Sequence, residues 1–242
     1  SKIKFNYNKI SAIICISSKI KKILEVDIKN KNILTTVHSG IDINRFANST
    51  NNNILRREFS LAPNNKIVAN ISAIADHKDY FTFVDTAEIV LKERENIVFF
   101  AIGDGPMTPT IKEYIKSKNL EKKIIMTGFR DDISDIFQEL DAFLITSKTE
   151  GLGTTILDAF ANKIPVIGTA AGGIPEAVIN NETGLLSEIK DAKSLAKNVI
   201  DVLTKPDEAK LRTEKAYKKL LDEFTTSSMV KGNIEVYESI IS

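Results

Sequence analysis

Residues 142–161 read AFLITSKTEGLGTTILDAFA, and this stretch decides the fold class. It opens on four apolar residues, Ala142–Ile145, which is typical of a strand buried on both faces. A loop with two glycines, Gly151 and Gly153, then leads into a helical pattern over Thr154–Ala161. A buried strand, a glycine-bearing turn and a helix in this order form one unit of an α/β domain.

The same alternation continues on both sides of this stretch. Further strands are predicted at Ile67–Ile71, Ile97–Ile102, Ile124–Thr127 and Pro165–Gly168, and further helices at Tyr80–Leu91, Pro109–Ser117 and Ile133–Glu139. From Asp191 onward the pattern is helical, with Pro206 separating two of the helices. The sequence therefore predicts an α/β fold with a doubly wound, Rossmann-like parallel sheet.

The first forty residues follow a different pattern. A strand is predicted at Ile10–Ile16, a helix capped by Ser17 runs to about Val26, and a second strand follows at Asn32–Val37. We interpret residues 1–38 as the end of a neighbouring N-terminal domain with its linker, and residues 39–242 as the main domain. Because the sequence begins at Ser1 and not at Met, we expect it to be part of a longer polypeptide.

Composition excludes several classes of function. With 242 residues, 43% of them hydrophobic, the chain can bury a core without disulfides or a structural metal. Its 33 Lys and Arg against 32 Asp and Glu provide no net charge that would attract nucleic acid. The single cysteine, Cys15, excludes a disulfide framework and a cysteine-based zinc site, and two histidines leave little for a histidine site. The apolar run Ile10–Ile16 is too short to span a bilayer.

Three glycine-bearing loops follow predicted strands, at Glu150–Gly153, Gly172–Gly173 and Gly103–Pro106. Such loops at helix N-termini expose backbone N–H groups that bind anions. The first two loops are equally compatible with an ordinary turn, and Gly103–Pro106 is more typical of a structural turn that ends a strand. None of them matches the G-x-G-x-x-G or G-x-x-x-x-G-K-[ST] pattern, which disfavours a nicotinamide dehydrogenase and a P-loop ATPase.

Three charged residues are candidates for chemistry at the loops. Glu150 follows a strand, at the sheet edge where open α/β sheets bind ligands. Lys78 follows the strand Ile67–Ile71 and could reach a phosphate there; the alternative is a surface lysine. Asp158 lies off the apolar stripe of its helix, which predicts that it points away from the core, and a solvated helix carboxylate is the alternative.

In combination, these motifs resemble the retaining glycosyltransferases of the GT-B fold, the group that resembles glycosyltransferase family 4. The resemblance extends over essentially the whole chain. It rests on the runs Glu150-Gly151-Leu152-Gly153 with Asp158–Ile167, Gly172-Gly173-Ile174-Pro175-Glu176, Thr183-Gly184-Leu185-Leu186, Ser39-Gly40-Ile41-Asp42 with Phe46, Gly103-Asp104-Gly105-Pro106 and Gly128-Phe129-Arg130.

The resemblance implies an enzyme of two Rossmann-like domains, of which this chain holds the donor-binding domain and a fragment of the N-terminal acceptor domain. The helix around Phe224, Met229 and Tyr237 would cross back onto that N-terminal domain. The implied partners are a nucleotide-sugar donor and a glycan or lipid acceptor, with no nucleic acid, no metal and no other cofactor. The implied location is the cytoplasm, with peripheral association at the inner membrane face.

The resemblance also implies roles for single residues. Lys78 would bind the diphosphate and Glu150 would face the donor sugar, as the catalytic pair, while Asp158 would bind the ribose hydroxyls. Backbone near the sugar and phosphates, and at the edge of the nucleobase, would come from Gly151, Leu152, Gly153, Thr154, Gly172 and Gly173, and from Phe129 and Arg130. The chain departs from the family where a glycine–arginine pair becomes Ser72-Ala73, and where Asp158 replaces a glutamate.

Two alternatives stay open from sequence. A sugar-nucleotide epimerase of the same architecture would need acid–base groups in the cleft, and neither His38 nor His77 stands at a suitable spacing. A non-catalytic relic that binds nucleotide sugars is the other alternative, because the phosphate-binding arginine is missing.

Overall fold

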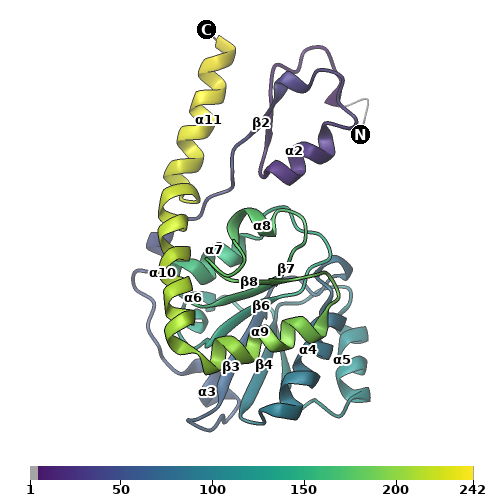
Figure 1. The fold of residues 1–242 in the computed structure, drawn as a ribbon, viewed down its shortest axis with the longest axis vertical. Helices are drawn as coiled ribbons and strands as arrows, with labels where there is room; N and C mark the ends of the chain where they lie inside the picture. The colour runs from purple at the N-terminus through teal and green to yellow at the C-terminus, as the bar shows by residue number, and fades with distance from the viewer. Residues whose placement is uncertain (1–4, 242) are drawn as a thin grey trace.

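The computed structural model describes residues 5–241, and its main domain is built on a parallel sheet (Figure 1). Six strands are described in the spatial order β5 (Ile124–Gly128), β4 (Ile97–Ile102), β3 (Lys66–Ile71), β6 (Ala142–Ile145), β7 (Val166–Thr169) and β8 (Leu185–Ser187). Every neighbouring pair in this sheet is parallel. The strand order changes direction between β3 and β6, and the carboxyl ends of these strands mark the edge where such sheets bind ligands.

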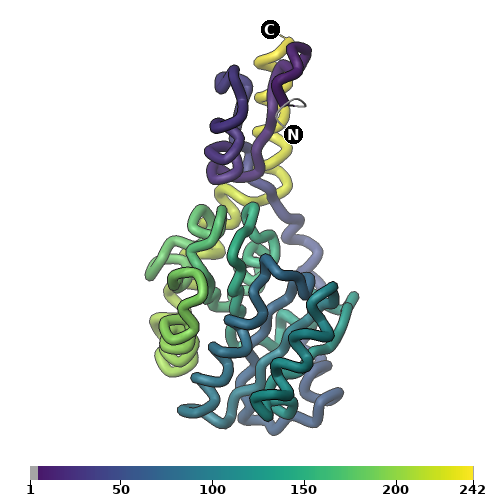
Figure 2. Tube along the Cα trace, turned by 90° about the vertical axis from the view of Figure 1, so that its right-hand side faces the viewer, coloured from purple at the N-terminus to yellow at the C-terminus, as the bar shows by residue number. Residues whose placement is uncertain are grey.

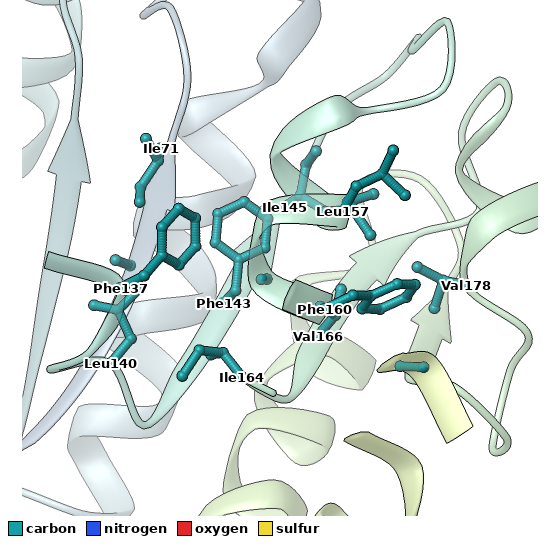
Figure 3. Packing of buried hydrophobic residues seen from close by; sticks show 14 of the residues in the cluster. Ile71, Phe137, Leu140, Phe143, Ile145, Leu157, Phe160, Ile164, Val166 and Val178 are labelled. Carbon is teal, nitrogen blue, oxygen red and sulfur yellow. The ribbon is translucent and has the colours of Figure 1, made fainter. Parts of the chain in front are cut away.

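Helices cover both faces of the sheet, as the continuous apolar strands require. One face is covered by α4 (Tyr80–Glu93), α5 (Thr108–Ser117) and α9 (Ala192–Thr204). The other is covered by α3 (Ile54–Glu58), α6 (Ile133–Phe137), α7 (Thr154–Ala161) and part of α10 (Pro206–Glu223). Figure 3 shows the second core, where Phe137, Phe143 and Phe160 pack between the sheet and α6 and α7.

A small unit precedes the main domain. Strand β1 (Ile13–Cys15) pairs in parallel with β2 (Leu34–Thr36), and α2 (Ser18–Leu24) connects them with the turn η1 (Lys31–Ile33). Figures 1 and 2 show this unit beside α11 (Thr226–Ile241), at the end of the main domain that carries α7 and α8 (Ile174–Ala177). The remaining short turns are η2 (Ile43–Phe46) and η3 (Asp76–Lys78).

The chain crosses between the two units twice, around Ile41 and around Thr225, and these two segments lie side by side. The Ile41 N–H donates to the Phe224 carbonyl at 2.9 Å, and the Thr226 N–H donates to the Ile41 carbonyl at 3.0 Å. A Cβ on Gly40 would lie 2.1 Å from the Thr225 carbonyl oxygen, so only glycine fits this crossing. Among residues 5–241, no helix has both the length and the apolar character that a membrane span needs.

The predicted α/β class is confirmed, and most element boundaries lie within two residues of those expected. Strands β4 and β6 and helix α7 begin and end where predicted. The two N-terminal strands are shorter than predicted, at three residues each, because each is limited by its pairing with the other from Ile13 to Cys15. The division at residue 38 stays a prediction, and residues 1–4 and 242 within it lie outside the described residues.

Candidate functional site

Lys78 and Glu150 form an ion pair at the carboxyl edge of the sheet. The Lys78 Nζ lies 2.5 Å from Glu150 Oε2, and both side chains are 14% exposed. Strands β3 and β6 are parallel neighbours, so the loops that follow them meet although Lys78 and Glu150 are 72 positions apart. The Ser147 hydroxyl donates to the same carboxylate oxygen at 3.2 Å. The structure thus brings together the two residues that the resemblance assigns to catalysis.

The two loops that carry this pair are joined by further hydrogen bonds. The Thr146 hydroxyl lies within 3.1 Å of the Lys78 and Asp79 carbonyls. The Lys148 N–H donates to the His77 carbonyl at 2.7 Å, and its Nζ pairs with Asp76 at 2.8 Å. Because these contacts fix the backbone on both sides, the ion pair is held by the scaffold and not by the side chains alone.

The Gly172–Gly173 loop packs directly on the backbone of Glu150. The Gly173 N–H donates to the Glu150 carbonyl at 2.9 Å. Gly172 has a φ of +57°, and a Cβ there would lie 1.9 Å from the Glu150 carbonyl oxygen. A Cβ on Gly173 would lie 2.0 Å from the Gly151 carbonyl oxygen. This pair of glycines is therefore required for the two loops to meet.

The loop after Glu150 leads into helix α7 with little side-chain cover. Gly153 occupies the N-cap position with a φ of +83°, and no side chain caps the helix. The first N–H groups of the helix are consequently available to an anion. Thr154, the first helical residue, is exposed, whereas Leu152 is buried in the core and can offer only its backbone.

Asp158 is more buried than the sequence predicted. Its side chain is 8% exposed and forms an ion pair with Arg45 of the turn η2, so it faces away from the sheet. The alternative of a solvated helix carboxylate is wrong because η2 covers this face of α7, with Ile43 and Phe46 packed on the core. Burial raises the pKa of Asp158 to about 6, while the Arg45 guanidinium acts in the opposite direction.

Arg45 was not identified from the sequence. Its guanidinium lies 4.7 Å from the centroid of the Phe46 ring, and Phe46 packs edge-on against Phe137 of α6. The aromatic contacts therefore fix the turn that presents Arg45 to Asp158. Its position directly before Phe46, in a run already compared with the family, is the signal that could have identified it.

Phe129 and Arg130 follow β5, on the far side of β4 from the Lys78–Glu150 pair. The Phe129 side chain is 82% exposed. Arg130 pairs with Asp132 at 2.6 Å and with Glu58 at 2.5 Å, and these carboxylates hold its pKa above the usual range. The Arg130 side chain is therefore occupied by acids of its own domain, while Phe129 is open to solvent.

The third predicted loop, Gly103–Pro106, packs against the segment that follows β3. A Cβ on Gly103 would lie 2.1 Å from the Ser72 carbonyl oxygen, and the Ile74 N–H donates to the Asp104 carbonyl at 3.0 Å. The loop Gly103–Pro106 thus packs on the segment that replaces the family's glycine–arginine pair.

A cavity of about 500 Å³ opens between the Glu150 loop and helix α2 of the small unit. Its walls combine residues of both units, among them Lys19, Ile20, His77, Lys148, Glu150 and Gly172. The sequence analysis did not predict that α2 would form one wall. Asp158, Phe129 and Arg130 lie outside this cavity.

The family model described as glycosyl transferases group 1 matches residues 51–219. The chain belongs to this family. The GT-B resemblance expected from the motifs is thereby confirmed, while the roles of single residues stay predictions.

Curated relatives of this glycosyltransferase family cover most of the chain. The N-acetyl-alpha-D-glucosaminyl L-malate synthase of Bacillus anthracis is 27% identical over 188 residues, which are 77% of this chain and 49% of that protein. An alpha-1,3-galactosyltransferase of Escherichia coli, named for a diphosphoundecaprenol-linked acceptor, is 26% identical over 70% of this chain and 45% of its own length. The chain spans about half the length of the curated relatives it matches.

Solved structures share the fold. A glycosyltransferase from Rickettsia africae has a TM-score of 0.89 at 24% identity, covering 100% of this chain and 67% of its own. Anabaena HepE, crystallised with UDP and glucose, has a TM-score of 0.84 at 21% identity, covering 96% of this chain and 63% of its own. At these identities the likeness concerns the fold alone.

Proposed function

We propose that this chain is the donor-binding part of a retaining glycosyltransferase, which moves a sugar from a nucleoside diphosphate to a glycan or lipid acceptor. The observation that carries the proposal is the Lys78–Glu150 pair, a shielded cation beside a carboxylate at the ligand-binding edge of the sheet. Family membership and the UDP-bound Anabaena structure support a nucleotide sugar as donor.

Lys78 supplies the charge that the departing diphosphate needs. When the bond between the anomeric carbon and the diphosphate breaks, the electron pair goes to a phosphate oxygen, and a fixed cation lowers the free energy of that charged state. The hydroxyl of the acceptor bonds to the same face of the sugar, and its proton passes to the departing phosphate oxygen, which has just received the electron pair. Because Lys78 is fixed by Thr146 and the neighbouring loop, little reorganisation is required.

Backbone amides complete the anion site in this proposal. The uncapped start of α7 and the Gly151–Thr154 loop present N–H groups close to Glu150. Gly172 and Gly173 lie against the same loop and extend the surface without side chains. With Lys78 and these amides as the source of positive charge, the proposed reaction uses no metal.

Glu150 is assigned to the donor sugar. Glu150 is one of the residues that line the cavity, and its carboxylate is paired with Lys78, so we assign it to accept hydrogen bonds from sugar hydroxyls and to stabilise positive charge at the anomeric carbon.

On the nucleoside side, Asp158 is assigned to the ribose hydroxyls and the backbone around Phe129 and Arg130 to the edge of the base. Arg45 holds the Asp158 carboxylate, and a bridging water could complete the reach of the shorter aspartate.

The acceptor and the cellular location are further parts of the proposal. The E. coli relative is named for a lipid-linked acceptor. An acceptor of this kind would bring the protein to the cytoplasmic face of a membrane as a peripheral protein.

Glu150→Ala tests the proposal by separating the sugar from the nucleotide. We expect the variant to lose affinity for UDP-glucose, or for the matching GDP or ADP sugar, while the free diphosphate binds as before. Titration calorimetry of the wild type with UDP, GDP and ADP, with and without EDTA, first identifies the base. Equal losses for the sugar donor and the free diphosphate would contradict the sugar assignment, and strict dependence on a divalent ion would contradict the metal-free one.

A further inference from the structure

Glu176 joins the main domain to the small unit. It lies in α8, and its carboxylate accepts hydrogen bonds from the N–H groups of Ser18 at 2.7 Å and Lys19 at 2.8 Å. The same carboxylate contacts His38 Nε2 at 3.0 Å. These partners are 138 to 158 positions away along the chain, and all three belong to the small unit or its exit.

The contacts satisfy the N-terminus of α2. The first N–H groups of a helix have no partner within the helix, and Ser17 accepts only from the Ile20 N–H. Glu176 accepts from the N–H groups of Ser18 and Lys19 in addition. Partial burial acts to raise the pKa of Glu176, but the hydrogen bonds from His38 and the two amides outweigh it and hold the pKa below its usual value.

The same short segment contacts the Glu150 loop at its other end. Gly173 accepts from the Glu176 N–H at 3.0 Å and donates to the Glu150 carbonyl at 2.9 Å. A Cβ on Gly173 would also lie 3.1 Å from the Ser17 Cβ, so the small unit lies against this glycine too. One turn, Gly172–Glu176, therefore contacts α2 on one side and the backbone of Glu150 on the other.

We propose that Glu176 is a positioning residue that fixes helix α2 and His38 relative to the Glu150 loop. By this contact it sets the width of the cavity of about 500 Å³, whose walls are Lys19 and Ile20 on one side and Glu150 and Gly172 on the other. The contact itself follows from the geometry alone, while its effect on the donor sugar rests on the proposed function.

Hydrogen exchange tests the contact without any ligand. In Glu176→Ala we expect the amides of Ser18 and Lys19 to exchange about tenfold faster or more, because both lose a charged acceptor. Glu182→Ala is the matched control, since this exposed glutamate lies in the next turn, where its N–H donates to the Ile179 carbonyl at 3.0 Å. Unchanged exchange at Ser18 and Lys19 in Glu176→Ala would overturn the proposal.

Ligand binding tests the consequence for the site. Glu176→Ala should weaken UDP-glucose binding about fivefold, a typical coupling between linked sites, and leave UDP binding within error. The affinity of Glu176→Gln for UDP-glucose should lie between those of the wild type and Glu176→Ala, because its amide oxygen can still accept from one N–H. His38→Gln should weaken UDP-glucose binding less than either variant at Glu176.

These outcomes separate the two proposals. If neither UDP nor UDP-glucose binds the wild type, and GDP and ADP fail as well, the proposed function fails while the exchange result still decides the contact. If exchange accelerates but UDP-glucose affinity is unchanged, the positioning of Glu150 by Glu176 is refuted.

Discussion

Two carboxylate–cation pairs mark the two ends of the candidate site, and they are built differently. Glu150 and Lys78 come from loops at neighbouring strand ends of one domain, and both are 14% exposed. Asp158 is 8% exposed inside a helix, whereas its partner Arg45 is 46% exposed and comes from the turn η2. The sheet determines the first pair, and the packing of η2 on α7 determines the second. Changes in η2 should therefore affect the Asp158 pair and leave the Lys78–Glu150 pair in place.

The largest expected effect comes from Gly172, which lies against the backbone of Glu150 in the first pair. In Gly172→Ala, the new Cβ overlaps the Glu150 backbone at a positive φ, so the loops must separate, and we expect about 3 kcal/mol of stability to be lost. Urea denaturation measures the loss. Gly128→Ala is the control, because Gly128 has a φ of +76° with nothing within 4 Å of the added Cβ, and backbone strain alone costs about 1–2 kcal/mol. Equal losses would show that the Glu150 contact carries no stability.

The second pair, Asp158 with Arg45, should make the free energy of unfolding depend on pH. The Asp158 pKa is raised from 3.8 to about 6, so the folded state binds this proton more tightly than the unfolded chain. The resulting stabilisation is complete below about pH 3.8 and is lost as the pH rises through about 6, an effect of about 3 kcal/mol.

The comparison with Asp158→Asn isolates this contribution from those of other carboxylates. The difference in unfolding free energy between wild type and variant should change across the window from pH 3.8 to 6 and be flat above it. Arg45→Ala should extend the window to higher pH, since the guanidinium acts to lower this pKa. A difference that is independent of pH would refute the assignment.

Lys78→Ala should reduce the affinity for a nucleoside diphosphate by about 1.5–3 kcal/mol, as expected for loss of a charged hydrogen bond. The parent nucleoside should bind almost as before, because Lys78 is assigned to the phosphates. Calorimetry with UDP and uridine checks this. Lys92→Ala serves as the control, since its Nζ pairs with Glu88 of the same helix α4 and the residue does not line the cavity. A uniform loss for nucleotide and nucleoside would make Lys78 a structural residue.

The smallest expected effect is on discrimination at the ribose. Asp158→Ala should lower UDP affinity by about 1.5 kcal/mol and remove the preference for UDP over 2′-deoxy-UDP. Arg45→Lys should retain part of that preference, because a lysine keeps the charge and loses the planar geometry. The ratio of the two dissociation constants is the measurement. An unchanged ratio in Asp158→Ala would exclude Asp158 from ribose recognition.

The main domain was predictable from sequence because its strands are apolar on both faces. Runs such as Ile97–Ile102 are too short for a buried helix and rich in β-branched and aromatic residues, which indicates a strand. Parallel pairing then brings the loops after β3 and β6 together. The meeting of Lys78 and Glu150 follows from this topology. Short elements were less predictable: β8 was not predicted, because three residues after Gly184 carry too little pattern.

The other side of the site could not be read from periodicity. The helical pattern around Asp158 indicates which face meets the sheet, but not that the turn η2 covers a second face. Arg45, Glu176 and His38 act through partners more than a hundred positions away, and no local pattern encodes such pairs. Sequence motifs therefore located the residues on the sheet edge and missed those that join the two units.

The crossing at Ile41 and Phe224 has a consequence for how this domain can be moved between proteins. The backbone of Ile41, where the chain enters this domain, is hydrogen-bonded at 2.9 and 3.0 Å to Phe224 and Thr226, where the chain leaves it. Residues 42–224 therefore form a segment whose first and last residues lie next to each other, as in a domain inserted into a host chain. A segment of this kind can be exchanged as one cassette, or circularly permuted at another loop, without redirecting the chain on either side. Recombination could thus exchange this segment in a single step without altering the small unit beside it.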